Sequence, residues 1–192
     1  MTRPIHALAR AIGLAALLAC GTAAAGPTYH VAIDTRAWAG QSGWLDFLIL
    51  GQAAASGVHA TLDGFGGIDP DGGGADIVLG DVAGSSATGV VLGNDAGWNE
   101  FGRWTRFGGR LSFDVTFDLD PAPGAGSTLE VALLDAGQNY LDAAGDVLAF
   151  ATLPGQAPVV TATDVVALPE APTTALWATG LVLLGLARRP RR

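Results

Sequence analysis

The chain contains no lysine, and it has one cysteine, Cys20, among its 192 residues. Cys20 lies in a predicted leader, so residues 26–168 contain no thiol and allow no disulfide or cysteine-ligated metal. Their fold must therefore rest on burial alone. The same residues carry seventeen acidic side chains against four arginines. Nucleic-acid binding needs a basic surface, so we expect no nucleic-acid partner.

Long apolar runs are also absent near the N-terminus. Two arginines are followed by an apolar stretch at 11–19 and by three alanines that end at Ala25. This order predicts a secretory signal peptide over residues 1–25, because the apolar stretch is shorter than the roughly 20 residues that a membrane span needs. The alternative interpretation is a lipoprotein leader with a lipidated Cys20, although Leu18 stands where such leaders have a small residue.

Glycine is abundant, with 24 in residues 26–168, and so much turn material favours short strands over long helices. Residues 111–120, "LSFDVTFDLD", alternate apolar and polar side chains, which is the pattern of a strand with one buried face. Residues 127–136 repeat the pattern. The segment "PAPGAG" between them reads as a loop, so we expect the two strands to form an antiparallel pair.

Seven further segments are short, rich in branched or aromatic residues and bounded by turn residues. They are residues 29–34, 44–50, 58–62, 76–82, 88–92, 147–153 and 159–166. About nine strands without an amphipathic helix predict an all-β fold. We expect an antiparallel β-sandwich over residues 26–167, with a barrel as the alternative.

The most unusual loop predicted is "GWNEFGRWTRFGG", in which aromatic and polar residues interleave. Aromatic rings beside hydrogen-bonding groups suit a carbohydrate-binding face. The spacing also fits a helical turn packed on the core, and Trp38 and Trp44 carry the same ambiguity. The candidate carbohydrate-binding residues are Trp98, Phe101, Trp104 and Phe107.

A second candidate is the stretch "DGFGGIDPDGGGADIVLGD", which offers the hard oxygen ligands that calcium prefers. Asp69, Asp71 and Asp76 are its candidate ligands. Only one imperfect copy of a calcium-binding β-helix repeat is present, whereas that repeat works in tandem. The preferred interpretation is a solvated turn without a cofactor.

Signs of catalysis are scarce. A nucleophile elbow, a P-loop and a dinucleotide fingerprint are all missing from the sequence. Asp114 and Asp118 share one strand face about 13 Å apart, which is too far for a glycosidase pair. His30 and His59 each stand alone in a predicted strand, as surface or edge histidines do. We expect no enzymatic activity.

The C-terminal segment, residues 168–192, is "LPEAPTTALWATGLVLLGLARRPRR". Its apolar part, 173–187, would form roughly 22 Å of helix, which is short of the roughly 30 Å hydrocarbon core. Arginines that follow such a helix remain on the cytoplasmic side. The segment is thus either a permanent membrane anchor or a signal that is recognised and removed.

This three-part segment resembles the PEP-CTERM sorting domain of Gram-negative bacteria, although Ala171 stands where that family usually has a second proline. The resemblance implies export across the inner membrane, transient anchoring and processing by an exosortase, and then release to the cell surface or the extracellular space. Such proteins are associated with exopolysaccharide and biofilm matrix. The residues at the positions of the sorting motif are Pro169, Glu170, Ala171, Arg188, Arg189, Arg191 and Arg192.

The preceding domain is similar to a group of small β-rich PEP-CTERM proteins, over most of residues 29–136. The matching stretches are "YHVAIDT", "SGWLDFLI", "GDVAGS", "VVLGND", "FGGRLSFDVTFDL" and "STLEVALLDA". This resemblance implies one domain and no catalytic residue. We therefore expect a structural protein of the cell surface or matrix, with an exopolysaccharide-binding module as the alternative.

Overall fold

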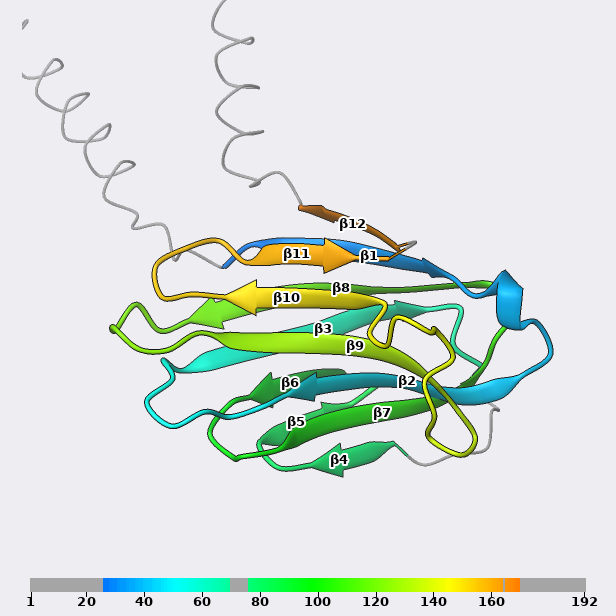
Figure 1. Cartoon of the computed structure of the whole chain (residues 1–192), viewed down its shortest axis with the longest axis horizontal. Helices are drawn as coiled ribbons and strands as arrows, with labels where there is room; N and C mark the ends of the chain where they lie inside the picture. The colour runs from blue at the N-terminus through cyan, green and yellow to red at the C-terminus, as the bar shows by residue number, and fades with distance from the viewer. Residues whose placement is uncertain (1–25, 70–75, 164, 170–192) are drawn as a thin grey trace, which may run out of the picture.

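The computed structural model describes residues 26–69, 76–163 and 165–169. These residues form two six-stranded sheets whose ladders are antiparallel, stacked face to face. Sheet A has the strand order β12-β1-β8-β3-β6-β5, and sheet B has the order β11-β10-β9-β2-β7-β4. Figure 1 shows sheet B in front of sheet A. The prediction of an all-β fold with two antiparallel layers is confirmed, and the sheets do not close into a barrel.

The strands of sheet A are β1 (Thr28–Asp34), β3 (Val58–Gly66), β5 (Val82–Ser85), β6 (Gly89–Gly93), β8 (Arg110–Leu119) and β12 (Val165–Pro169). The strands of sheet B are β2 (Ser42–Ile49), β4 (Ile77–Leu79), β7 (Asn99–Arg106), β9 (Ser127–Asp135), β10 (Leu148–Thr152) and β11 (Val159–Ala162). One short 3-10 helix, η1 (Arg36–Trp38), connects β1 to β2 within the described residues.

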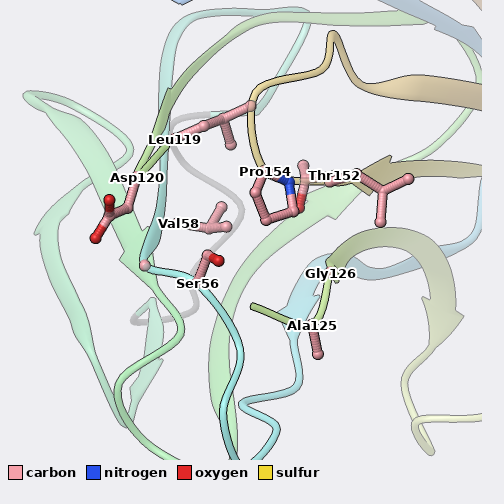
Figure 2. A pocket seen from close by; sticks show the side chains of 10 residues that line it. Ser56, Val58, Leu119, Asp120, Ala125, Gly126, Thr152 and Pro154 are labelled. Atoms are coloured by element: carbon pink, nitrogen blue, oxygen red, sulfur yellow. The ribbon is translucent and has the colours of Figure 1, made fainter. Parts of the chain in front are cut away.

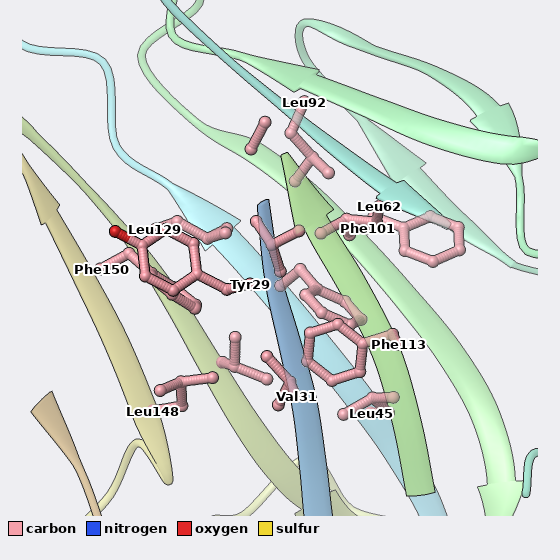
Figure 3. Packing of buried hydrophobic residues seen from close by; sticks show 14 of the residues in the cluster. Tyr29, Val31, Leu45, Leu62, Leu92, Phe101, Phe113, Leu129, Leu148 and Phe150 are labelled. Atoms are coloured by element: carbon pink, nitrogen blue, oxygen red, sulfur yellow. The ribbon is translucent and has the colours of Figure 1, made fainter. Parts of the chain in front are cut away.

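Alternating residues of both sheets meet in one core between the layers. Phe47 of sheet B packs edge-on against Phe113 of sheet A, with ring centroids 4.9 Å apart, and neither ring is exposed. Phe117 and Phe150 make a second contact between the sheets at 5.3 Å. Figure 3 shows side chains of both sheets in one cluster, among them Val31 of β1, Phe113 of β8 and Phe150 of β10. Burial of such rings supplies the stability that no disulfide provides here.

The expected pairing of residues 111–120 with residues 127–136 is wrong. Both segments are strands, β8 and β9, but they lie in different sheets. β8 pairs with β1 and β3, while β9 pairs with β2 and β10. The "PAPGAG" segment therefore crosses between the layers. Alternation shows which face of a strand is buried, but it does not show which strand is the neighbour.

Two predicted strands are each divided between the sheets. Residues 76–82 become β4 in sheet B and the start of β5 in sheet A, and residues 159–166 become β11 in sheet B and the start of β12 in sheet A. The first division falls at Gly80, which has a φ of 74°. A Cβ there would lie 2.0 Å from the carbonyl oxygen of Trp98, so the crossing requires glycine.

The stretch predicted as an aromatic loop or helical turn is mostly strand β7, and this corrects the prediction. Its inward positions include polar Asn99 and Thr105, both fully buried, and one of its outward positions is Gly102. These residues hide the alternation that marks a strand. Asn99 is satisfied by donating hydrogen bonds to the carbonyls of Ile49 and Ala96, at 3.0 and 2.8 Å.

Candidate functional site on the outer face of sheet B

The central strand of sheet B, β2, places three side chains on the outer face of the sandwich. Leu45 and Phe47 are fully buried in the core, so Trp44, Asp46 and Leu48 face the opposite way. Register with the neighbouring strands β7 and β9 arranges this face in three rows. They are Trp104-Trp44-Leu134, Gly102-Asp46-Ala132 and Glu100-Leu48-Glu130.

The first row carries a tryptophan pair. The rings of Trp44 and Trp104 meet edge to face with centroids 5.0 Å apart, and both side chains are partly exposed. Trp98, just before β7, is 52% exposed, and its indole Nε1 donates a hydrogen bond to Glu100 Oε2 at 2.6 Å. Three tryptophans thus lie on or beside the same face as the carboxyl groups.

The second row has small residues on both sides of Asp46. A Cβ at Gly102 would lie 3.3 Å from Asp46 Oδ1 and equally close to Ile77, so glycine makes the room that this carboxyl group occupies. Asp46 is only 9% exposed. Its Oδ1 is buried, and no N–H or O–H donor of the described residues reaches it. A buried polar atom of this kind is rare and calls for an explanation.

The surroundings of Asp46 favour its protonated form. Burial, the charge of Glu100, a hydrogen bond to Glu100 and the charge of Asp146 raise the pKa of Asp46 from 3.8 to about 7. Burial also raises the pKa of Asp146, and burial with the charge of Asp146 raises the pKa of Glu130. We call Asp46, Glu100, Glu130 and Asp146 the carboxyl cluster.

Tyr140, in the loop between β9 and β10, lies beside the carboxyl cluster. Burial raises the pKa of its hydroxyl group, and the charges of Asp146, Glu130 and Asp46 raise it further. The ring remains 57% exposed. An aromatic side chain with a hydroxyl group is therefore available at the rim of the cluster.

The structure separates the four predicted carbohydrate-binding residues. Trp104 lies on the outer face and Trp98 beside it, whereas Phe101 and Phe107 are buried at 0% and 2% exposure in the core. The two phenylalanines are therefore removed from the candidate site, because a surface ligand does not reach them. Trp44 takes their place through register with Trp104. The sequence pattern did not identify Asp46, whose signal was a lone aspartate within an apolar strand.

Two of the three calcium candidates, Asp69 and Asp76, belong to the described residues. The Asp76 carboxylate accepts hydrogen bonds from Arg103 Nη1 and the Ser86 backbone N–H, both at 3.1 Å. The Asp69 backbone N–H donates to Thr105 Oγ1 at 3.3 Å. Asp71 lies outside the described residues. Among the residues that are described, no three histidine, cysteine or acidic side chains are grouped to hold a metal ion. The solvated turn stays the prediction for this stretch, with calcium binding as its alternative.

The two histidines of the described residues, His30 and His59, lie on the outer face of sheet A. Nδ1 of His30 is 2.6 Å from Oδ1 of Asp114, which is its partner across β1 and β8. His59 is opposite Asp118 across β3 and β8. Both rings are exposed. An exposed histidine paired with one carboxylate lacks the further ligands of a zinc site.

A small pocket lies between the start of β3 and the ends of β8 and β10 (Figure 2). Small and apolar residues form most of its lining. The Ser56 hydroxyl donates to the Ala122 carbonyl at 2.6 Å, and Asp120 Oδ1 accepts from the Ala122 backbone N–H at 2.8 Å. These polar groups serve the local turn, so the pocket offers little for binding a ligand.

The predicted targeting segments fall mainly outside the described residues. The signal peptide with Cys20, and the sorting segment from Glu170 onward, belong to that part of the chain. Pro169 is the last residue of β12 and is opposite Tyr29 of β1. Within the described ranges, no helix has the length and hydrophobicity of a membrane span.

Comparison of the chain with protein-family models, with curated proteins and with solved structures finds no match. The class of the molecule is therefore stated from its own structure. It is an antiparallel β-sandwich with tryptophans and a carboxyl cluster on the outer face of one sheet.

Proposed function

We propose that this chain is an exported, non-catalytic protein of the cell surface or matrix, and that its sandwich binds polysaccharide through the outer face of sheet B. The observation that carries the proposal is the partly exposed edge-to-face pair of Trp44 and Trp104 beside the carboxyl cluster. Indole rings stack on the apolar faces of sugars, and neighbouring carboxyl groups accept hydrogen bonds from sugar hydroxyls.

The position of the tryptophans supports binding over a purely structural role. The core between the sheets is filled by other aromatic rings, so the outer tryptophans do not complete it. Trp98 is more than half exposed and its indole N–H is oriented by Glu100. Exposed aromatic groups gathered on one face are a mark of interaction sites.

The carboxyl groups suit binding better than hydrolysis. A glycosidase holds two carboxyl groups about 5 to 9.5 Å apart on either side of the scissile bond. Asp46 and Glu100 instead lie side by side on the neighbouring strands β2 and β7 of one sheet face, close enough for Glu100 to raise the pKa of Asp46. The proposal therefore assigns no catalytic residue to this face.

The proposed localisation rests on the sequence. A signal peptide at 1–25 supports export, and the resemblance of residues 168–192 to a PEP-CTERM segment supports sorting by an exosortase with transient attachment to the membrane. Both features agree with a role beside exopolysaccharide. The low content of basic residues supports the absence of a nucleic-acid partner.

Isothermal titration calorimetry of the exported protein with a panel of neutral, acidic and amine-bearing oligosaccharides tests the proposal. We expect binding of at least one saccharide, and at least a tenfold loss of affinity in Trp44→Ala and in Trp104→Ala. Trp38→Phe is the control, because Trp38 is a partly buried tryptophan of η1 that packs against the core. If no saccharide binds, or if Trp104→Ala binds like the wild type, the proposed site is wrong.

A further inference from the structure

The charge on the outer face of sheet B restricts the ligand to one chemical class. Resting on the function proposed above, we propose that this face selects amine-bearing saccharides. Their ammonium group lies against Glu100 or Glu130, beside the Asp46 row, while a sugar ring stacks on Trp44 or Trp104. The face thereby distinguishes a free amino sugar from its N-acetylated form and from acidic sugars.

The carboxyl cluster has no countercharge beside it among the described residues. Asp46 comes from β2, Glu100 from β7, Glu130 from β9 and Asp146 from the loop before β10, so four segments bring acidic groups to one area. The chain has no lysine. Among the described arginines, Arg36 pairs with Asp34 and Arg103 with Asp76. Arg110 belongs to β8 of sheet A, and Arg106 lies beyond Trp104 from the cluster. The negative charge is therefore left for a ligand to balance.

The Asp46 carboxyl group has an unsatisfied oxygen atom. This carboxyl group is more than nine-tenths buried on the outer face, and its Oδ1 meets no donor of the described residues. Oδ1 itself is covered by neighbouring atoms, so a ligand on this face meets the carboxyl groups of Glu100 and Glu130, which flank Leu48 in the next row. An ammonium group supplies three N–H donors and a positive charge, so it can donate to such a glutamate. A neutral hydroxyl group supplies one donor and no charge.

The aromatic row and the carboxyl row are neighbours on this face. Trp44 and Asp46 are two residues apart on one strand face, which corresponds to about 7 Å along β2. A sugar ring over the tryptophans therefore places its substituents above the Asp46 row. A cation at this position is also attracted to the faces of the indole rings.

The carboxyl cluster suits this ligand better than a metal ion. A divalent cation is held by several oxygen atoms that converge on one point. The carboxyl cluster does not provide such convergence, since the described residues include no group of three acidic or histidine side chains arranged for a metal. The groups are spread over neighbouring strands, which suits a larger cation carried on a sugar ring.

The experiment compares three short probes of equal length by calorimetry with the exported protein at pH 6. They are a glucosamine oligomer, an N-acetylglucosamine oligomer and a galacturonate oligomer. We expect the glucosamine oligomer to bind at least tenfold more tightly than the N-acetylated one, and the galacturonate oligomer to bind most weakly. Added salt should weaken binding of the glucosamine oligomer selectively.

Two variants locate the selectivity. Glu100→Gln and Glu130→Gln keep the size of the side chain, and each should reduce the preference for glucosamine at least threefold with little effect on the N-acetylated probe. Asp118→Asn is the matched control, because Asp118 is an exposed carboxylate on sheet A. Thermal unfolding verifies that each variant is folded.

The outcomes are distinct. Equal affinity for the glucosamine and N-acetylglucosamine oligomers would overturn the inference and leave the proposed polysaccharide-binding function intact. Equal losses in Asp118→Asn and Glu130→Gln would show attraction to the overall negative charge, which also overturns the inference. Failure of every saccharide to bind would overturn the proposed function itself.

Discussion

Among single residues, Asp46 differs most from an ordinary surface aspartate. It faces outward from β2, yet it is nearly buried between the backbone of Gly102 and the side chain of Ala132. The titratable groups around it are Glu100 from β7, Glu130 from β9, and Tyr140 and Asp146 from the loop before β10. All four are acids, so each additional charge there opposes ionisation of Asp46.

This environment predicts how stability depends on pH. The pKa of Asp46 is about 7 in the folded chain against 3.8 in the unfolded chain, so the folded state binds this proton more tightly. The stabilisation of the folded state by this proton is complete below about pH 4. It is lost as the pH rises to about 7, which lowers the free energy of unfolding by an amount on the order of 4 kcal/mol. We expect Asp46→Asn to remove much of this loss and to be more stable than the wild type at pH 8.

Denaturant unfolding at pH 4.5, 6 and 8 measures the effect. The raised pKa values of Glu130 and Asp146 add to the same slope, so Asp46→Asn should keep part of it. The lowered pKa values of Asp34 and Asp135 act mainly below pH 4 and with the opposite sign. Asp118→Asn is the control and should follow the wild type. A wild-type free energy of unfolding that rises from pH 4.5 to 8 would contradict the prediction.

At the scale of elements, β7 shows where sequence patterns succeed and where they do not. Alternation in residues 111–120 predicted β8 almost to its ends, because every inward residue there is apolar. In β7 only one inward residue, Phe101, is apolar. The other inward positions hold Asn99, Arg103 and Thr105. Buried polar groups that find partners in the tertiary structure have no periodic signature in the sequence. The site was therefore predicted as a loop, with two of its four aromatic residues on the wrong side.

Substitutions on the two faces of β7 should lower the free energy of unfolding by different amounts. Phe101 contacts the rings of Phe47 and Phe65, so Phe101→Ala should lower the free energy of unfolding by about 3 to 5 kcal/mol. Trp104→Ala, three residues later, should cost clearly less stability while it lowers the affinity for saccharide. Denaturant unfolding and calorimetry on both variants give the comparison. Equal destabilisation by the two would place Trp104 in the structural core and contradict the orientation of β7.

At the scale of the whole molecule, the chain repeatedly passes between the sheets. Among other crossings, it leaves sheet B after β4 and enters sheet A at β5, returns to sheet B at β7, passes to sheet A at β8 and back to sheet B at β9, and enters sheet A again between β11 and β12. Each of these crossings lies in a short connection that resembles a turn within one sheet, so composition predicted the number of layers but not the strand order. The last crossing places the beginning of the expected sorting segment at the edge of the folded domain.

The final strand leads to a prediction about the processed protein. β12 pairs with β1 from Tyr29 opposite Pro169 to Ile33 opposite Val165, and it covers an edge of β1 that would otherwise present unpaired backbone groups. We expect the exported protein to end after Pro169, with Arg192 removed and β12 intact, as measured by intact mass spectrometry. A chain shortened to end at residue 163 should unfold at a lower temperature and self-associate, whereas one that ends at residue 169 should do neither. An intact Arg192 on the exported protein would contradict sorting by removal of the segment, and a C-terminus before Val165 would contradict a structural role for β12.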